Sequence, residues 1–336
     1  MKKQLLVLIT LLVAFGVQAL GQAGAPLKLV QTIKLAAEVK GHFDHFEIDL
    51  TGNRLFATPE DYKAVLVFDV KTGKLIHTIG GIGRPHAVLY REDINRIYIT
   101  DGDAGDVKIF DATSYALLSS VKLLEDSDSI GYDPTTKYLY VDNGGGDVHE
   151  TYSMFSIVDT TAGKKVTDIK IDGDTLEAMA LEKSSPKIYV NNKAKNQVEV
   201  VDRGKREVVA SWPVTKCKGN VAMGFDEANH RLFVACRTGE MVVLDTQTGK
   251  ELSVLPITKG VDDVVYDSAS KRVYAAGDGS VDVYLQNGPD DYKLLGTVPT
   301  GPVGRTARLV PELNRYFVAV PPHGSANAEI LVFEVH

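Results

Sequence analysis

The sequence predicts an all-β protein, a seven-bladed β-propeller with four-stranded blades whose ring is closed by an N-terminal strand. The first observation is a six-residue phrase, a polar and usually basic start followed by alternating apolar and aromatic residues, which recurs seven times. The copies are residues 53–58, 95–100, 137–142, 186–191, 230–235, 271–276 and 314–319. The second observation is the spacing between the equivalent basic residues of these copies, which is 42, 41, 50, 44, 41 and 43 residues. Strand repeats with a period in the low forties form propeller blades. The third is the near absence of helix signals after the first twenty residues.

Each repeat continues into a second pair of strands joined by a tight turn. The clearest case is a strand at 64–69, a turn at 70–73 and a strand at 74–79. Asp69 accepts backbone N–H groups at the start of this turn, and Gly73 adopts the positive φ near its end. Equivalent Asp residues in the other repeats are therefore interpreted as turn formers and not as catalytic groups.

The two ends of the chain predict how the ring closes. Residues 330–335 read as the third strand of the last blade, and no fourth strand follows. Residues 27–33 resemble the outer strand at 74–79, so we expect them to supply the missing strand and to cover the open edges. The 50-residue step places one insertion, predicted to be a surface loop, near 144–152.

The N-terminus predicts a secreted protein. Lys2 and Lys3 precede an apolar stretch from Leu5 to Val17, and small residues offer cleavage after Ala19 or Ala23. We therefore expect residues 1–23 to be a signal peptide, residues 24–336 to form a single propeller domain, and the location to be periplasmic or secreted. A retained N-terminal anchor is the alternative, but the stretch is short for a membrane span and no second one follows.

Charge and cysteine content narrow the classes of function. The net charge of −7 becomes −9 without Lys2 and Lys3, and an acidic body argues against nonspecific nucleic-acid binding. The only cysteines are Cys217 and Cys236. An oxidising compartment favours a disulfide, yet the hairpin register places Cys236 opposite residue 220, beyond disulfide reach unless the loop folds back. A disulfide and two separate thiols both remain open.

Phrases such as 188–191, Ile-Tyr-Val-Asn, followed by a D-x-x-x-G-K turn, resemble the YVTN-type β-propeller repeats of the YncE-like family of secreted bacterial proteins. The resemblance spans residues 24–336, although most copies end in Ala or Thr. It implies the propeller fold and the compartment. It implies no established reaction, so the catalytic residues stay unassigned.

The first strand of each blade lines the central channel, so residues at equivalent positions on these strands share one rim. Alignment on Asp49, Asp133, Asp226 and Asp267 predicts such a ring. Its members are Asp44, His86, Asp128, Glu177, Val221, Asp262 and Thr306. Five of the seven carry a carboxyl or imidazole group, and charges that converge on one axis repel unless a cation or partner offsets them.

These positions and their neighbours form the predicted ligand-binding rim. The predicted rim residues are Asp44, His45, Arg84, His86, Asp128, Glu177, Asp262, Asp263 and Arg305. The densest group of potential metal ligands, His42, Asp44, His45 and His86, suggests a divalent metal as a possible cofactor. The alternative to a ligand or metal site is a rim whose charged side chains are only solvated or salt-bridged, with Arg84 and Arg305 pairing with the carboxylates.

These observations suggest two main functions and a third alternative. The first is a non-enzymatic module of the cell envelope that binds a small molecule, a peptide or a protein through the channel rim, with a monomer favoured. The second is a metal-dependent hydrolase, lactonase or lyase with a cation at that rim. A propeller holding a quinone or haem is a third, weakly supported alternative, because the sequence has no C-x-x-C-H motif.

Overall fold

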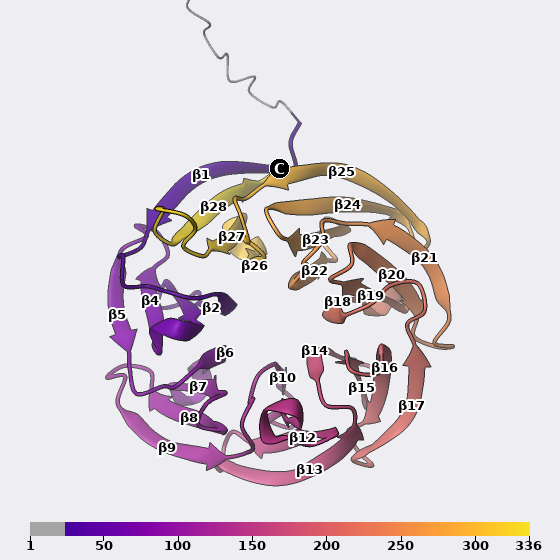
Figure 1. Ribbon diagram of the computed structural model, residues 1–336, viewed down its shortest axis with the longest axis horizontal. Helices are drawn as coiled ribbons and strands as arrows, with labels where there is room; N and C mark the ends of the chain where they lie inside the picture. Colours follow the sequence, from indigo (N-terminus) through magenta and orange to yellow (C-terminus); the bar gives the residue numbers. More distant parts are fainter. Residues whose placement is uncertain (1–23) are drawn as a thin grey trace, which may run out of the picture.

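The computed structural model describes residues 24–336, which form a ring of seven four-stranded antiparallel sheets around a central channel (Figure 1). The prediction of a seven-bladed propeller is confirmed. The predicted signal peptide, residues 1–23, lies outside the described residues. Within residues 24–336, none of the helical segments has the length and apolar character needed to cross a membrane.

Two strands of each blade lie nearest the channel. The innermost strands are β2 (Phe43–Asp49), β6 (Pro85–Arg91), β10 (Ile130–Asp133), β14 (Leu176–Leu181), β18 (Asn220–Asp226), β22 (Asp263–Asp267) and β26 (Thr306–Val310). The second strands carry the repeated phrase and are β3 (Arg54–Pro59), β7 (Arg96–Asp101), β11 (Tyr138–Gly144), β15 (Lys187–Asn192), β19 (Arg231–Cys236), β23 (Arg272–Gly277) and β27 (Arg315–Val320).

The other two strands of each blade form its outer half. The third strands are β4 (Val65–Asp69), β8 (Asp106–Asp111), β12 (Tyr152–Asp159), β16 (Gln197–Asp202), β20 (Glu240–Asp245), β24 (Ser280–Gly288) and β28 (Glu329–Val335). The outer strands are β5 (Leu75–Ile79), β9 (Leu117–Lys122), β13 (Lys164–Asp172), β17 (Glu207–Pro213), β21 (Glu251–Pro256), β25 (Asp291–Pro299) and β1 (Leu27–Lys34).

The first strand of the chain closes the ring. β1 pairs antiparallel with β28, so one blade contains both ends of the described chain (Figure 1). This confirms the predicted closure, which removes the two sheet edges that an open ring would expose.

Backbone geometry explains the polar start of the repeated phrase. Its first residue has a positive φ in six of the seven copies, including Asn53, His230 and Asn314. Non-glycine residues adopt this left-handed conformation most readily when they are polar, as Asn is. Three of these hairpins also contain a 3-10 turn, namely η2 (Glu92–Ile94), η4 (Glu227–Asn229) and η5 (Pro311–Leu313), whereas η1 (Glu60–Tyr62) follows β3.

The outer hairpins confirm the predicted role of the turn Asp residues. The Asp69 carboxylate accepts hydrogen bonds from the Thr72 N–H and hydroxyl, and Gly73 has a φ of 69°. Asp245 accepts the N–H groups of residues 247 and 248 in the same way. These carboxylates stabilise turns at the periphery, far from the channel.

The hydrophobic core is divided among the contacts between neighbouring blades. One cluster, for example, joins Tyr140 and Phe155 of the third blade to Leu176, Ile188 and Val190 of the fourth. Each phrase thus buries its apolar side chains on both faces, since each blade packs against two others. The repeated Tyr and Phe residues fill these interfaces, and Tyr189, Tyr274 and Phe233 are fully buried.

Cys217 and Cys236 form a disulfide with a Cα–Cα distance of 5.9 Å. The predicted register holds, because Asn220 lies opposite Cys236. The loop nevertheless folds back, because the Asn196 side chain donates to the Cys217 carbonyl at 2.8 Å and accepts the Gly219 N–H at 3.0 Å. The alternative of two separate thiols is therefore wrong.

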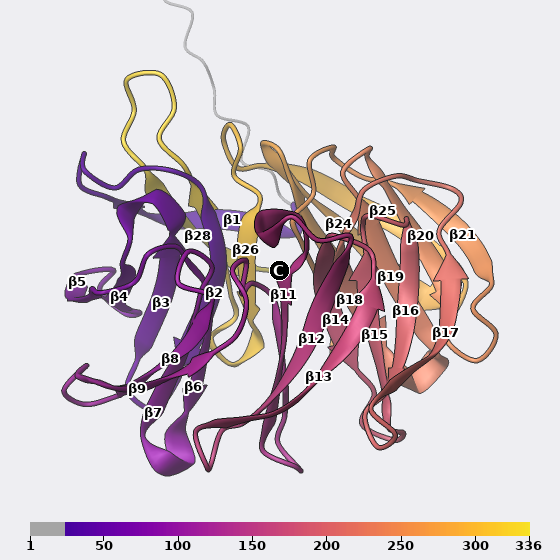
Figure 2. The ribbon, with the colours of Figure 1, turned by 60° about the horizontal axis from the view of Figure 1, so that its bottom comes forward.

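The insertion in the third blade is compact. Residues 145–148 form a 3-10 turn, η3 (Gly145–Val148), in which Gly145 is buried and Asp147 accepts a hydrogen bond from Arg84 at 2.8 Å. By contrast, the β27–β28 connection, residues 321–328, extends from one end of the ring (Figure 2).

Replacing both cysteines by alanine should lower the free energy of unfolding by about 3 kcal/mol. The disulfide joins residues that are 19 positions apart, so it closes a loop of this length in the unfolded chain and reduces its conformational entropy. Urea unfolding with and without a thiol reductant measures the effect. The reductant should destabilise the wild type and leave the double variant unchanged. Equal stability of the oxidised and reduced wild type would contradict the expectation.

Candidate functional site

A polar cavity of about 150 Å³ opens at one end of the channel, and all seven blades contribute to its wall. We call it the rim cavity. Its lining residues are Asp44, His45, Glu60, His86, Asp128, Ser129, Glu177, Ala178, Val221, Arg237, Asp262 and Arg305. Apart from Ser129, Ala178 and Val221, every one of them can carry a charge.

The structure brings together seven of the nine predicted rim residues in this lining. Asp263 lies one step deeper and lines an adjoining chamber. Arg84 stands outside the lining and binds Asp126 at 3.2 Å and Asp147 at 2.8 Å. His42 is exposed and does not line the cavity, so the structure does not place it with the other predicted metal ligands.

β-Bulges turn the rim side chains toward the mouth. The pairing of the first and second strands shifts register between Phe43 and Phe46, between Pro85 and Val88, and between Leu176 and Met179. A bulge re-aims side chains at the end of a strand. In the first blade the Thr58 hydroxyl stabilises it, accepting the His45 N–H at 2.8 Å and donating to the His45 carbonyl at 2.9 Å.

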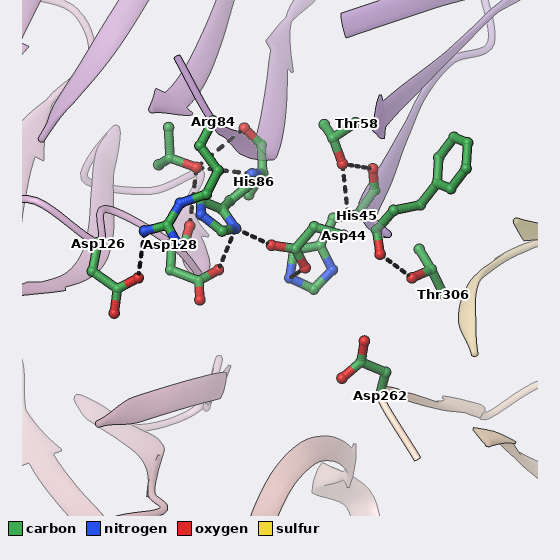
Figure 3. A network of polar contacts seen from close by, with 12 residues as sticks. Asp44, His45, Thr58, Arg84, His86, Asp126, Asp128, Asp262 and Thr306 are labelled. Carbon is green, nitrogen blue, oxygen red and sulfur yellow. Dashed lines mark hydrogen bonds and ion pairs between the residues drawn. The ribbon is translucent and has the colours of Figure 1, made fainter. Parts of the chain in front are cut away.

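Asp44 is the centre of an acid–imidazole cluster (Figure 3). Its Oδ2 binds His86 Nδ1, and its Oδ1 lies 3.4 Å from His45 Nε2. Burial lowers the pKa of His86, but the carboxylates of Asp128 and Asp44 outweigh it and raise that pKa to about 10. Both the His45 and the His86 partners hold the pKa of Asp44 below its ordinary value against the effect of burial.

Asp128 is the third member of this cluster, and its carboxyl group is crowded by other carboxyl groups. Its Oδ1 lies 3.6 Å from His86 Nδ1. Burial raises the pKa of Asp128 well above its ordinary value, and although His86 opposes this, Asp44 and Glu177 reinforce it. Asp142 is buried on β11, and burial together with Asp128 raises its pKa as well. Crowded carboxyl groups of this kind retain protons or attract a cation.

The opposite wall of the rim cavity carries guanidinium groups. Arg237 Nη2 donates to Asp262 Oδ1 at 2.6 Å, and Arg305 Nε lies 3.3 Å from Asp262 Oδ2. Burial raises the pKa of Asp262 to about 7, although Arg237 and Arg305 oppose the shift. Arg305 also reaches Asp278 at 3.5 Å. The rim cavity therefore has an acid–imidazole side and an arginine side.

Sequence reasoning missed the second source of rim charge, which is the second residue after each phrase. These positions are Glu60, Gly102, Gly144, Lys193, Arg237, Asp278 and Pro321. Three of them pair with a predicted rim residue: Lys193 donates to Glu177 at 2.7 Å, Arg237 binds Asp262, and Asp278 binds Arg305. The available signal was that four of these seven positions, Glu60, Lys193, Arg237 and Asp278, carry a charge.

One part of the rim has the composition of a cation site. Asp44, His45 and Asp128 each offer a ligand atom, and these atoms lie within 4.8 Å of one another. Carboxylate and imidazole ligands suit Zn²⁺ and Mn²⁺. His86 holds the second oxygen of Asp44, as the groups that orient metal ligands do.

Comparisons with known proteins agree with the fold. No protein-family model matches the sequence. Two curated relatives, each described as uncharacterized protein YncE, from Salmonella typhi and Salmonella typhimurium, are 30% identical over 115 residues, which are 34% of this chain and 32% of the relative. The matched segment thus spans about a third of the length of these curated relatives.

Among solved structures, hydrazine synthase of Kuenenia stuttgartiensis matches with a TM-score of 0.71 and 16% sequence identity, over 89% of this chain and 96% of that chain. This match shows the fold alone. The YncE matches, together with the seven-bladed ring, confirm the predicted resemblance to the YncE-like β-propellers.

The raised pKa of Asp262 predicts a specific pH dependence of stability. Because its folded pKa of about 7 exceeds its ordinary value of 3.8, the stability that it contributes is present below pH 3.8 and is lost as pH rises through 7. Relative to Asp262→Asn, the wild type should lose up to about 4 kcal/mol between pH 4 and 8. Urea unfolding of both proteins across this range measures it, and a constant difference would contradict the shift.

Proposed function

We propose that the chain is a binding module of the cell envelope that captures a small polar ligand, or one charged group of a peptide, in the rim cavity. One observation supports it most: ionisable side chains from all seven blades converge on a single concave volume of about 150 Å³. A concave site with a few convergent polar groups is the usual form of a small-molecule site.

The charge balance of the rim favours a binding role over a purely structural network. Glu177 and Asp262 have basic partners at 2.7 and 2.6 Å. Asp128 has only a longer and shared partner, since His86 Nδ1 lies 3.6 Å away and is also bound to Asp44. A buried carboxyl group in this position costs stability, and a bound group of suitable charge offsets that cost.

The proposed location rests on two features. The leader pattern of residues 1–23 is that of a secreted protein. The disulfide between Cys217 and Cys236 is of a kind that persists in oxidising compartments such as the periplasm.

The proposal predicts that ligand binding depends on both sides of the rim. Calorimetric titration of a panel of amino acids, amines, carboxylates and sugars should find a class that binds the wild type. Asp44→Asn and Arg237→Gln should each weaken that binding by about tenfold or more, because hydrogen bonds to charged groups contribute about 1.5–3 kcal/mol.

The matched controls are Asp172→Asn and Arg206→Gln, which remove the same charges from exposed positions outside the rim cavity. They should bind as the wild type does. A panel without any binder, or equal affinity of wild type and rim variants, would contradict the proposal.

A metal-dependent hydrolase, lactonase or lyase is the second candidate, supported by the grouping of Asp44, His45 and Asp128. A cation bound there would polarise a carbonyl oxygen or activate a water in the cavity. This candidate predicts one Zn²⁺ or Mn²⁺ per chain in tag-free protein, measured by elemental analysis, and its loss in His45→Gln. Metal bound at less than a tenth of stoichiometry after dialysis against Zn²⁺ and Mn²⁺ would exclude it.

A further inference from the structure

A larger chamber of about 290 Å³ lies beneath the rim cavity. The two share His45, Ser129 and Ala178 in their walls, so they adjoin. The chamber is lined chiefly by apolar side chains of the innermost strands, among them Phe46, Val88, Leu89, Ile130, Met179 and Ala307. The channel therefore changes from polar to apolar immediately below the rim.

The apolar lining is available to a ligand. Leu89, Ile130 and Met179 are only partly buried, in contrast to the fully buried phrase residues such as Tyr189. The charged groups of the chamber are paired, since Arg308 Nη2 lies 3.2 Å from Glu47 Oε2 and Asp263 Oδ1 lies 3.7 Å from His45 Nδ1. An apolar group that entered would be removed from water without displacing an ion partner.

The rim above it presents complementary charges on opposite walls. Asp44 and Asp128 lie together on one side, whereas Asp262 stands apart from them (Figure 3). Arg237 and Arg305 contact Asp262. Among residues 24–336, the buried Nε atom of Arg237 has no hydrogen-bond partner, whereas Arg305 Nε lies 3.3 Å from Asp262 Oδ2. One wall thus offers crowded carboxyl oxygens to a donor, and the other offers the guanidinium groups of Arg237 and Arg305 to an acceptor.

We propose, on the basis of the binding function proposed above, that the ligand is a free α-amino acid with an apolar side chain. Its carboxylate binds Arg237 and Arg305, and its ammonium group binds Asp44 and Asp128. Its side chain passes His45 into the chamber. The charged groups of the amino acid therefore lie in the polar rim cavity, and its apolar side chain lies in the apolar chamber beneath.

The first test is calorimetric titration of the full chain with glycine, alanine, valine and leucine. Affinity should rise by about fourfold for each added methylene that enters the chamber. Removing either charge of leucine, in 3-methylbutylamine or 4-methylpentanoate, should weaken binding by about tenfold or more, because each loses charge-assisted hydrogen bonds. Equal affinities along the series, or equal binding of the amine, would overturn the proposal.

The second test places a polar group in the chamber. Leu89→Asn should weaken leucine binding at least about fourfold and leave glycine binding unchanged, because only the side chain reaches this depth. Leu117→Asn is the control, since Leu117 is an exposed leucine on the outer strand of the same blade. Met179→Gln repeats the test from another blade, should Leu89→Asn not fold.

The outcomes separate this inference from the function on which it rests. If another class of the panel binds in a manner that depends on Asp44 and Arg237 while leucine does not bind, the amino-acid assignment is wrong and the rim function stands. If leucine binds equally well to the Leu89→Asn and Leu117→Asn variants, the chamber does not hold its side chain. If no member of the panel binds, the proposed function fails as well.

Discussion

The convergence of seven innermost strands on one axis is the constraint from which the site follows. Side chains at the entrance of these strands cannot spread apart, because each strand is held between two neighbouring blades. Charges that would be ordinary on a convex surface therefore share one small volume, where desolvation and mutual repulsion shift their pKa values. The raised pKa values of Asp128 and Asp262 are direct consequences.

The compensation for this crowding is uneven around the ring. In the fourth and fifth blades the end of the second strand supplies Lys193 and Arg237. In the second and third blades Gly102 and Gly144 occupy the same position, so no side chain is available there. A Cβ at residue 102 would lie 2.6 Å from His86 Nε2, which explains the glycine. The carboxylates of Asp44 and Asp128 therefore share the single imidazole of His86, and the cluster arises where no side chain at residues 102 and 144 can compensate them.

Much of the fold and of the rim could be predicted from the sequence, because the blades repeat one pattern of residues. The phrase gave the blades, the incomplete last repeat gave the closure by β1, and alignment of the first strands gave Asp44, His86, Asp128, Glu177 and Asp262. What escaped prediction depends on single contacts. Arg237 follows the end of a strand, where the copies differ, and the disulfide depends on the side chain of Asn196 in another blade. The bulge after Phe43 separates His42 from the cluster that its neighbours form.

The central claim is that the rim carries its charges for a ligand and not for the stability of the ring. The most direct measurement is the free energy of unfolding of Asp128→Asn at pH 8, with a chelator present and no added ligand. Removing a crowded carboxyl group that is only partly compensated by His86 should leave stability unchanged or raise it, by about 1 kcal/mol or more. A loss of about 3 kcal/mol, the cost of breaking a structural buried ion pair, would contradict the claim.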